Sequence, residues 1–175
     1  MQHFESRPAP DDEALATRTV KPLPERGPEP VEPPAAVPHS DSPRVSIIIP
    51  AYRHFEATAA CLASLATTRC DTPVEIIVAD DASGDDSVDK LRGIEGLRLL
   101  AADENLGFIG NCNRAAEQAR GEFVCFLNND TEVLDGWLDA LLDTFERRPD
   151  AGLVGARLVY PDGTLQECGG LIFSD

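Results

Sequence analysis

Short apolar runs, rich in β-branched residues and separated by helical patterns, constrain the fold of this chain most strongly. Residues 45–49 and 74–79 are apolar except for one polar position in each run, a composition typical of strands buried on both faces of a sheet. Between them, Phe55, Ala59 and Leu62 recur at helical spacing and form one apolar stripe. We therefore expect a strand, a helix and a second strand in succession.

The same alternation continues along the rest of the chain. Further strands are predicted at residues 97–101, 123–127 and 152–159, and further helices near 87–92, from 108 to about 119, and over 136–147. Such alternation implies right-handed crossovers and a largely parallel sheet. We predict an α/β, Rossmann-like fold with helices on both faces of a mostly parallel sheet.

The region before the first strand differs in composition. Prolines and charged residues dominate residues 1–43, where large apolar side chains are scarce. Too little apolar surface is available there to offset the entropy of ordering the backbone. We predict a disordered, acidic, Pro-rich tail over residues 1–43 and one folded domain over residues 44–175.

Net charge and hydropathy restrict the classes of binding partner and the cellular compartment that are expected for this protein. The formal net charge of -16 argues against a nucleic-acid partner, because binding a polyanion depends on basic side chains. An anionic substrate would need a bound cation to offset the negative charge of the protein. The sequence contains neither an apolar run of about 20 residues, the length that spans a bilayer, nor a secretory signal. We therefore expect a cytoplasmic protein.

Polar residues concentrate in the loops that follow the predicted strands. In an open parallel sheet, ligands bind beyond the carboxyl ends of the strands, where the crossover loops gather. The loop after the fourth strand places Asp130 directly beyond a buried apolar run. One carboxylate, together with waters and substrate phosphates, is a common way of binding Mg²⁺ or Mn²⁺. The alternative is that Asn128 or Asp130 forms an Asx turn or caps the next helix.

The loop after the second strand also admits two interpretations. Asp80 or Asp81 could accept a hydrogen bond from the imide or amide group of a nucleobase, and such buried acceptors discriminate strongly between ligands. Alternatively, Ser83, Asp85 or Asp86 caps the short helix that follows.

Taken together and in order, these loops resemble the family 2 glycosyltransferases of GT-A fold. The resemblance covers residue 45 to about residue 173, and the segments that carry it are Val45–Tyr52, Ile77–Asp85, Asn105–Phe108 with Asn111–Asn113, and Phe126–Thr131. The Leu127-Asn-Asn-Asp variant and the later Cys168-Gly-Gly are similar to the rhamnosyltransferase-like branch, which acts on bacterial surface polysaccharides.

This resemblance implies roles for individual residues. Contacts with the nucleotide-sugar are implied for Pro50, Ala51, Tyr52, Asp80, Asp81, Asn105, Gly107, Asn113, Asn128 and Asn129. The implied metal ligand is Asp130, which would hold Mn²⁺ or Mg²⁺. The DxD motif of the family has asparagine at its first position here, so Asn128 and Asn129 are implied to contact the sugar nucleotide rather than the metal.

The resemblance also implies an activity. The family transfers a sugar from a nucleoside-diphosphate donor, UDP- or dTDP-linked here, to a glycan or lipid-linked acceptor, with inversion and with a metal. In this family the general base is a carboxylate well beyond the fifth strand. We therefore expect the base beyond Asp175, where this chain ends. Neither Glu167 nor Asp175 lies in a motif that resembles the one around the family's base. Peripheral membrane association is a further implication, although no basic amphipathic helix is visible.

Two alternative functions belong to other classes. A truncated or inactive domain that binds nucleotide-sugar without turnover would explain why the chain ends before the expected base. A sugar nucleotidyltransferase is disfavoured, because its chemistry requires a glycine-rich, basic phosphate loop after the first strand. Residues 50–53, Pro-Ala-Tyr-Arg, do not provide one.

Overall fold

The computed structural model describes residues 31–168. These residues fall into two compact units, 31–154 and 155–168. Most of the predicted tail, residues 1–30, lies outside the described residues. The Gly-Gly pair that follows Cys168, and the carboxylate of Asp175, also lie outside them.

The first unit is built on a four-stranded, wholly parallel sheet with the strand order β3-β2-β1-β4. Its strands are β1 (Val45–Ala51), β2 (Val74–Asp80), β3 (Leu97–Ala101) and β4 (Phe123–Phe126). The helices between and after them are α2 (Phe55–Thr67), α3 (Ser87–Leu91), α4 (Gly107–Ala116) and α5 (Trp137–Arg147). The predicted α/β class, with its mostly parallel sheet, is confirmed.

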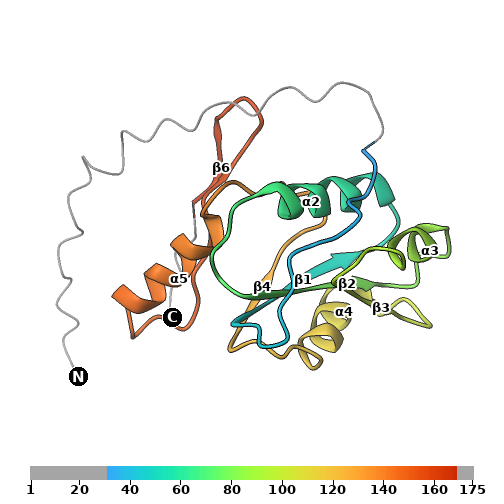
Figure 1. The fold of residues 1–175 in the computed structure, drawn as a ribbon, viewed down its shortest axis with the longest axis horizontal. Helices are drawn as coiled ribbons and strands as arrows, with labels where there is room; N and C mark the ends of the chain where they lie inside the picture. Colours follow the sequence, from blue (N-terminus) through green and yellow to red (C-terminus); the bar gives the residue numbers. More distant parts are fainter. Residues whose placement is uncertain (1–30, 169–175) are drawn as a thin grey trace, which may run out of the picture. The chain divides into compact units, whose positions relative to one another are not determined.

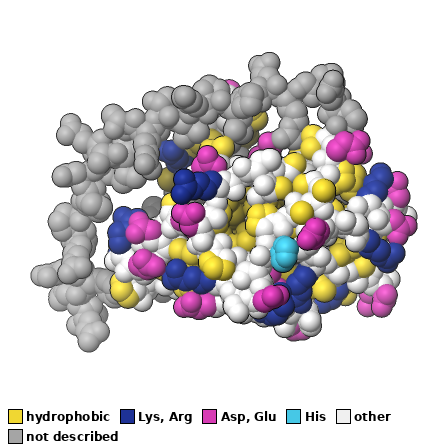
Figure 2. Space-filling view, viewed as in Figure 1, with side chains coloured by type: hydrophobic (Ala, Val, Ile, Leu, Met, Phe, Trp, Pro, Cys, Tyr) yellow, Lys and Arg dark blue, Asp and Glu magenta, His cyan; other side chains and the backbone are white. Residues whose placement is uncertain are grey.

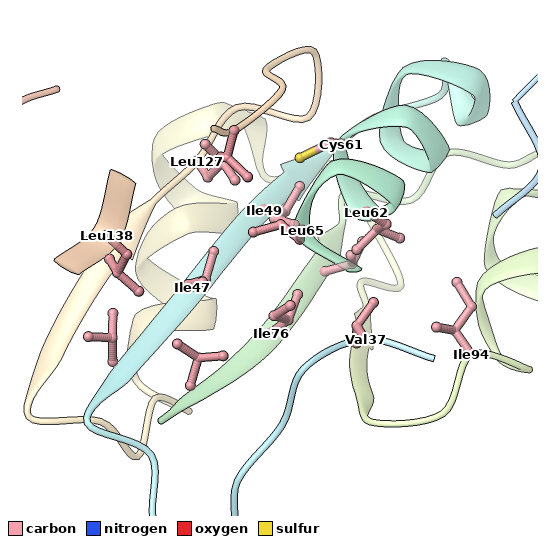
Figure 3. Packing of buried hydrophobic residues seen from close by; sticks show 14 of the residues in the cluster. Val37, Ile47, Ile49, Cys61, Leu62, Leu65, Ile76, Ile94, Leu127 and Leu138 are labelled. Atoms are coloured by element: carbon pink, nitrogen blue, oxygen red, sulfur yellow. The ribbon is translucent and has the colours of Figure 1, made fainter. Parts of the chain in front are cut away.

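The two central strands are buried on both faces because apolar side chains alternate between two packed layers. Ile47 and Ile76 belong to the larger cluster, which also contains residues of α2, α3 and α5. Ile48 and Ile77 face the opposite side and pack with Ala115 of α4. Figure 1 shows α2 and α4 on opposite sides of the sheet, and Figure 3 shows the larger cluster between α2 and the strands.

A buried carboxylate joins the strands near the start of β2, far from their carboxyl ends. Glu75 accepts hydrogen bonds from Ser46 Oγ (2.6 Å) and from the backbone N–H of Arg120 (2.7 Å), and it is paired with the guanidinium groups of Arg98 and Arg120. Burial by itself raises the pKa of Glu75, but these hydrogen bonds outweigh it and lower the pKa to about 2. Glu75 therefore ties β1, β2 and β3 to the loop before β4.

The prediction of a fifth strand in the sheet, over residues 152–159, is wrong. Only Leu158–Val159 is extended (β5), and it pairs antiparallel with Leu165–Glu167 (β6) in a separate two-stranded sheet. The connecting turn explains the difference. Gly163 adopts a φ of 86°, and Asp162 accepts hydrogen bonds from the backbone N–H and the hydroxyl of Thr164. A local hairpin turn of this kind pairs neighbouring strands without a crossover.

The packed unit includes residues upstream of position 44, where the sequence analysis placed the domain boundary. Val37 is only 4% exposed and belongs to the larger apolar cluster. Its N–H donates to the carbonyl of Glu95 (2.9 Å), and the N–H of Glu95 donates to Ala35 O (2.9 Å). One buried valine and two backbone hydrogen bonds thus attach this segment beside the start of β3, although its composition is rich in proline.

Candidate functional site

A cleft of about 500 Å³ lies at the carboxyl ends of β1, β2 and β4. This is the edge at which loops of a parallel sheet gather and at which ligands are expected. The residues that line it are Pro50, Ala51, Tyr52, Asp81, Asn105, Gly107, Phe108, Asn111, Asn128, Asn129 and Asp130. The cleft therefore brings together most of the residues singled out from the sequence; of that set, Asp80 and Asn113 do not line it.

Asp81 is the best-anchored carboxylate of the cleft. It is 4% exposed, and its Oδ1 accepts a hydrogen bond from the backbone N–H of Leu106 (2.8 Å). Its carbonyl accepts from Asn105 Nδ2 (3.2 Å), and its N–H donates to Ala51 O (2.9 Å). Asp81 thus joins the loop after β2 to the end of β1 and to the loop after β3, and its carboxylate is held in a fixed position at the cleft wall.

Asp80, the neighbouring carboxylate, is directed into the protein. It is 2% exposed, and its oxygens accept hydrogen bonds from the backbone N–H (3.1 Å) and the hydroxyl of Ser83. Successive side chains at the end of a strand point to opposite sides, so only one of two adjacent aspartates can face the cleft. The N-cap of α3 is Asp86, whose side chain makes no capping hydrogen bond, while Asp85, one residue earlier, accepts from the N–H of Ser87 (2.9 Å).

The loop after β1 places Tyr52 at the cleft and then has an unusual backbone conformation at the next two residues. Arg53 and His54 have φ values of 58° and 52°, in the left-handed region that non-glycine residues seldom occupy. The N–H of Arg53 donates to Ser83 Oγ (2.7 Å), and its guanidinium lies 5.1 Å from the centroid of the Tyr52 ring. Because Asp80 in turn holds Ser83, the first two loops of the cleft are fixed to one another.

The loop after β4 carries the candidate metal ligand. Residues 128–131 form a turn in which the N–H of Thr131 donates to Asn128 O (3.1 Å), and Asp130 is exposed at the cleft. Helix α5 begins only at Trp137, with Gly136 as its N-cap. The alternative that Asn128 or Asp130 caps that helix is therefore wrong, and the Asp130 carboxylate remains available to a ligand.

The donor atoms around Asp130 suit a metal that takes most of its ligands from a substrate. In the described part of the chain, no group of three or more His, Cys, Asp or Glu side chains could hold a metal ion by itself. In the loop after β4 the cleft offers one carboxylate, that of Asp130, beside the carboxamides of Asn128 and Asn129. Mg²⁺ and Mn²⁺ are commonly bound by one or two carboxylates together with phosphate oxygens and waters, so this set fits such an ion.

Two residues that line the cleft, Phe108 and Asn111, fall in segments that carry the resemblance but had no predicted contact with the ligand. Asn111 is 1% exposed, and its amide donates to Ala79 O at the end of β2 (2.6 Å) while its Oδ1 accepts from Arg114 (2.9 Å). Helical spacing relates Asn111 to Gly107, but it does not indicate which side of the helix faces the cleft. In α4, positions 107, 108 and 111 share one face, whereas the predicted Asn113 lies two residues further round the helix and is exposed.

The charged side chains that line the cleft all have the same sign. Among the described residues that line it, the charged ones are Asp81 and Asp130, both negative. The face shown in Figure 2 carries Lys and Arg interspersed with Asp and Glu rather than gathered into a basic patch. The described lining therefore offers no basic side chain to a ligand.

A family model connects this fold and cleft to a class of enzymes. Residues 46–167 match the model described as Glycosyl transferase family 2. This match covers more than half of the chain, so the chain belongs to glycosyl transferase family 2. The resemblance inferred from the four loops is thus confirmed.

Similar proteins of known sequence are much longer than this chain. Protein y4gI of Sinorhizobium fredii is 35% identical over 92% of this chain, which corresponds to 18% of its own length. The O-antigen biosynthesis protein RfbC of Myxococcus xanthus is 34% identical over 81% of this chain and 11% of its own. An N-acetylglucosaminyl-diphospho-decaprenol L-rhamnosyltransferase of Mycobacterium tuberculosis is 34% identical, covering 64% and 39%. The chain thus spans between about a tenth and two fifths of these relatives.

Solved structures support the GT-A fold. S. aureus TarS in complex with UDP-GlcNAc is 29% identical, with a TM-score of 0.52, and the alignment covers 61% of this chain and 32% of TarS. The mannosyltransferase PcManGT from Pyrobaculum calidifontis, in complex with GDP-Man and Mn²⁺, shares the fold at 23% identity, with a TM-score of 0.53 and coverages of 75% and 38%. As to membranes, no helix among residues 31–168 is both long and apolar enough to cross one.

Proposed function

We propose that this chain is the nucleotide-sugar-binding part of a metal-dependent, inverting glycosyltransferase. The donor is a UDP- or dTDP-linked sugar, and the acceptor is a hydroxyl group of a glycan or of a lipid-linked glycan. The observation that carries the proposal is the cleft of about 500 Å³, in which residues of three strand ends meet the start of α4. The family match and the structure of TarS in complex with UDP-GlcNAc support the same class of donor.

The geometry of the cleft supports a division of roles among its residues. Asp81, buried and held by the N–H of Leu106, accepts the imide N–H that uracil and thymine share. Tyr52, 44% exposed at the cleft, offers its ring to the nucleoside. Asp130 holds Mn²⁺ or Mg²⁺, which when bound neutralises the diphosphate and the charge that develops on it as a leaving group.

The transfer itself is a displacement at the anomeric carbon. The acceptor oxygen forms a bond to that carbon on one side, the bond to the diphosphate oxygen breaks on the other, and the nucleoside diphosphate leaves with the electron pair. The proton of the acceptor hydroxyl passes to a general base. For this base we keep the residue that the resemblance predicts, which is a carboxylate beyond Asp175.

A second candidate function is nucleotide-sugar binding without turnover. The observation in its favour is that the two carboxylates among the described cleft residues, Asp81 and Asp130, are both assigned to the donor. The two functions share the donor site and differ in whether sugar is transferred. Transfer to an acceptor in the presence of a nucleotide-sugar would favour the enzyme.

The donor site can be tested by calorimetric titration of the chain with UDP and dTDP, with and without Mn²⁺. We expect binding that requires Mn²⁺ and that weakens at least tenfold in Asp130→Ala, because even the outer-shell partners of metal sites contribute that much. Asp103→Ala is the matched control, since it removes an exposed carboxylate near the same sheet edge that does not line the cleft. Equal affinities of Asp130→Ala and the wild-type chain would refute the assignment.

A further inference from the structure

One side of α2 carries small polar side chains, although much of this helix packs in the core. Thr58, Cys61 and Ser64 follow each other at three-residue intervals, which places them along one side of a helix. Thr58 and Cys61 are fully buried, at 1% and 0% exposure. Thr68, the C-cap residue of α2, continues the row. We call these four residues the α2 polar stripe.

The first half of the stripe contacts the two asparagines of the cleft. Thr58 Oγ1 accepts a hydrogen bond from Asn129 Nδ2 (3.1 Å), and the thiol of Cys61 donates to Asn128 O (3.8 Å). In Figure 3 the sulfur of Cys61 points from α2 toward Leu127, the residue before this loop. A side-chain amide and a backbone carbonyl immediately before Asp130 are therefore bound by the helix.

The second half of the stripe contacts the far end of the same loop. The N–H of Val133 donates to Ser64 Oγ (3.1 Å), and Thr68 Oγ1 donates to Val133 O (3.3 Å). Ser64 can accept in this way because its own proton is donated to Cys61 O (2.7 Å). The loop is thus held on both sides of Asp130 by one helix.

We propose that the α2 polar stripe positions the loop from residue 128 to residue 133, and with it the carboxylate of Asp130. The loop needs such a support because β4 ends at Phe126 and α5 begins at Trp137. Helix α2 is a rigid base, since Leu62 and Leu65 pack in the core with β1 and β2. The ligand part of this proposal rests on the function proposed above.

Thr58 gives the sharpest binding test. In Thr58→Val the shape is retained but the acceptor of Asn129 is lost, so we expect Mn²⁺-dependent UDP binding to weaken about tenfold, as when a partly buried hydrogen bond is broken. Thr58→Ser keeps the hydroxyl oxygen and should restore the affinity for UDP. A general loss of packing at position 58 would not explain such a recovery. Thr67→Val is the control, because the Thr67 hydroxyl donates within α2 to Ala63 O and is exposed. Equal affinities in Thr58→Val and Thr67→Val would overturn the proposal.

A second measurement does not depend on any ligand. Amide hydrogen exchange in Ser64→Ala should speed up at least tenfold at Val133, whose N–H loses its acceptor, with the amides of β1 unchanged. An unchanged Val133 amide, or an equal increase in β1, would overturn the positioning role. If the wild-type chain binds neither UDP nor dTDP, the proposed function fails, while the exchange experiment still decides whether the stripe holds the loop.

Discussion

Two carboxylates of this chain, Glu75 and Asp130, lie in opposite surroundings. Glu75, far from the cleft, is buried among Ser46, Arg98 and Arg120 and is held as an anion with a pKa of about 2. Asp130 is exposed at the cleft, where a metal and a diphosphate can reach it. Removing the first should affect folding, and removing the second should affect binding.

The stability of the chain should therefore depend on the ionisation of Glu75. Its pKa is lowered from 4.5 to about 2, so its contribution of about 3 kcal/mol is complete above pH 4.5 and is lost as the pH falls toward 2. We expect Glu75→Gln to lower the unfolding free energy by about 3 kcal/mol at pH 7, and by progressively less below pH 4.5, in urea titrations. Glu146→Gln, which removes an exposed ion pair with Arg44, should change it by less than about 1 kcal/mol.

Among the elements, α4 decides which of its asparagines can serve the cleft. The helix packs Ala115 against Ile48 and Ile77, and this contact sets its rotation. Asn111 then points to the end of β2 and to the cleft, while Asn113 is exposed on another face. The motif predicts a contact for Asn113 and none for Asn111, because it indicates the segment but not the rotation of the helix.

Alanine substitutions on α4 distinguish these two residues. We expect Asn111→Ala to weaken nucleotide binding about tenfold, because the loss of a buried hydrogen bond to Ala79 O loosens the cleft wall. Asn113→Ala, the same change two residues later, should leave the affinity within about twofold. Calorimetry with UDP and Mn²⁺ measures both, and a larger effect at Asn113 would show that the helix turns differently when ligand is bound.

At the level of the whole chain, the packed unit that contains the cleft extends beyond the segment that its strand pattern outlines. Val37 adds its side chain to the apolar cluster, and Gly96 makes room for the segment that carries it. At Gly96, with a φ of 79°, an added Cβ would lie 2.7 Å from Val37 O. The upstream segment is therefore part of the folded unit, in spite of its proline-rich composition.

This attachment predicts a measurable contribution to stability. We expect Val37→Ala to reduce the unfolding free energy by about 1–2 kcal/mol, the range for removing buried methyl groups. Val124→Ala provides the comparison, because Val124 is 43% exposed in β4 and its loss should matter by about 0.5 kcal/mol or less. Thermal or urea unfolding measures both; similar values would mean that Val37 contributes no more than an exposed residue.

The four-stranded α/β core and the edge where the site lies follow from the amino-acid sequence alone. Local apolar patterns indicate β1 to β4 and their helices, and the runs of β1 and β2 are nearly continuous because these two strands are buried on both faces. Parallel connections then bring every strand's carboxyl end to one edge. For this reason the order of strands and loops is enough to predict that Pro50, Tyr52, Asp81, Asn105 and Asp130 are neighbours.

Tertiary packing selects which side chain of each motif faces the cleft and what supports it. The choice of Asp81 over Asp80, and of Asn111 over Asn113, depends on how strand ends and α4 are turned by packing. The α2 polar stripe and the attachment of Val37 join residues distant in sequence, and a one-dimensional pattern does not record such contacts. The hairpin of β5 and β6 differs, since the Asp162-Gly163 turn is a local signal that the apolar run before it obscures.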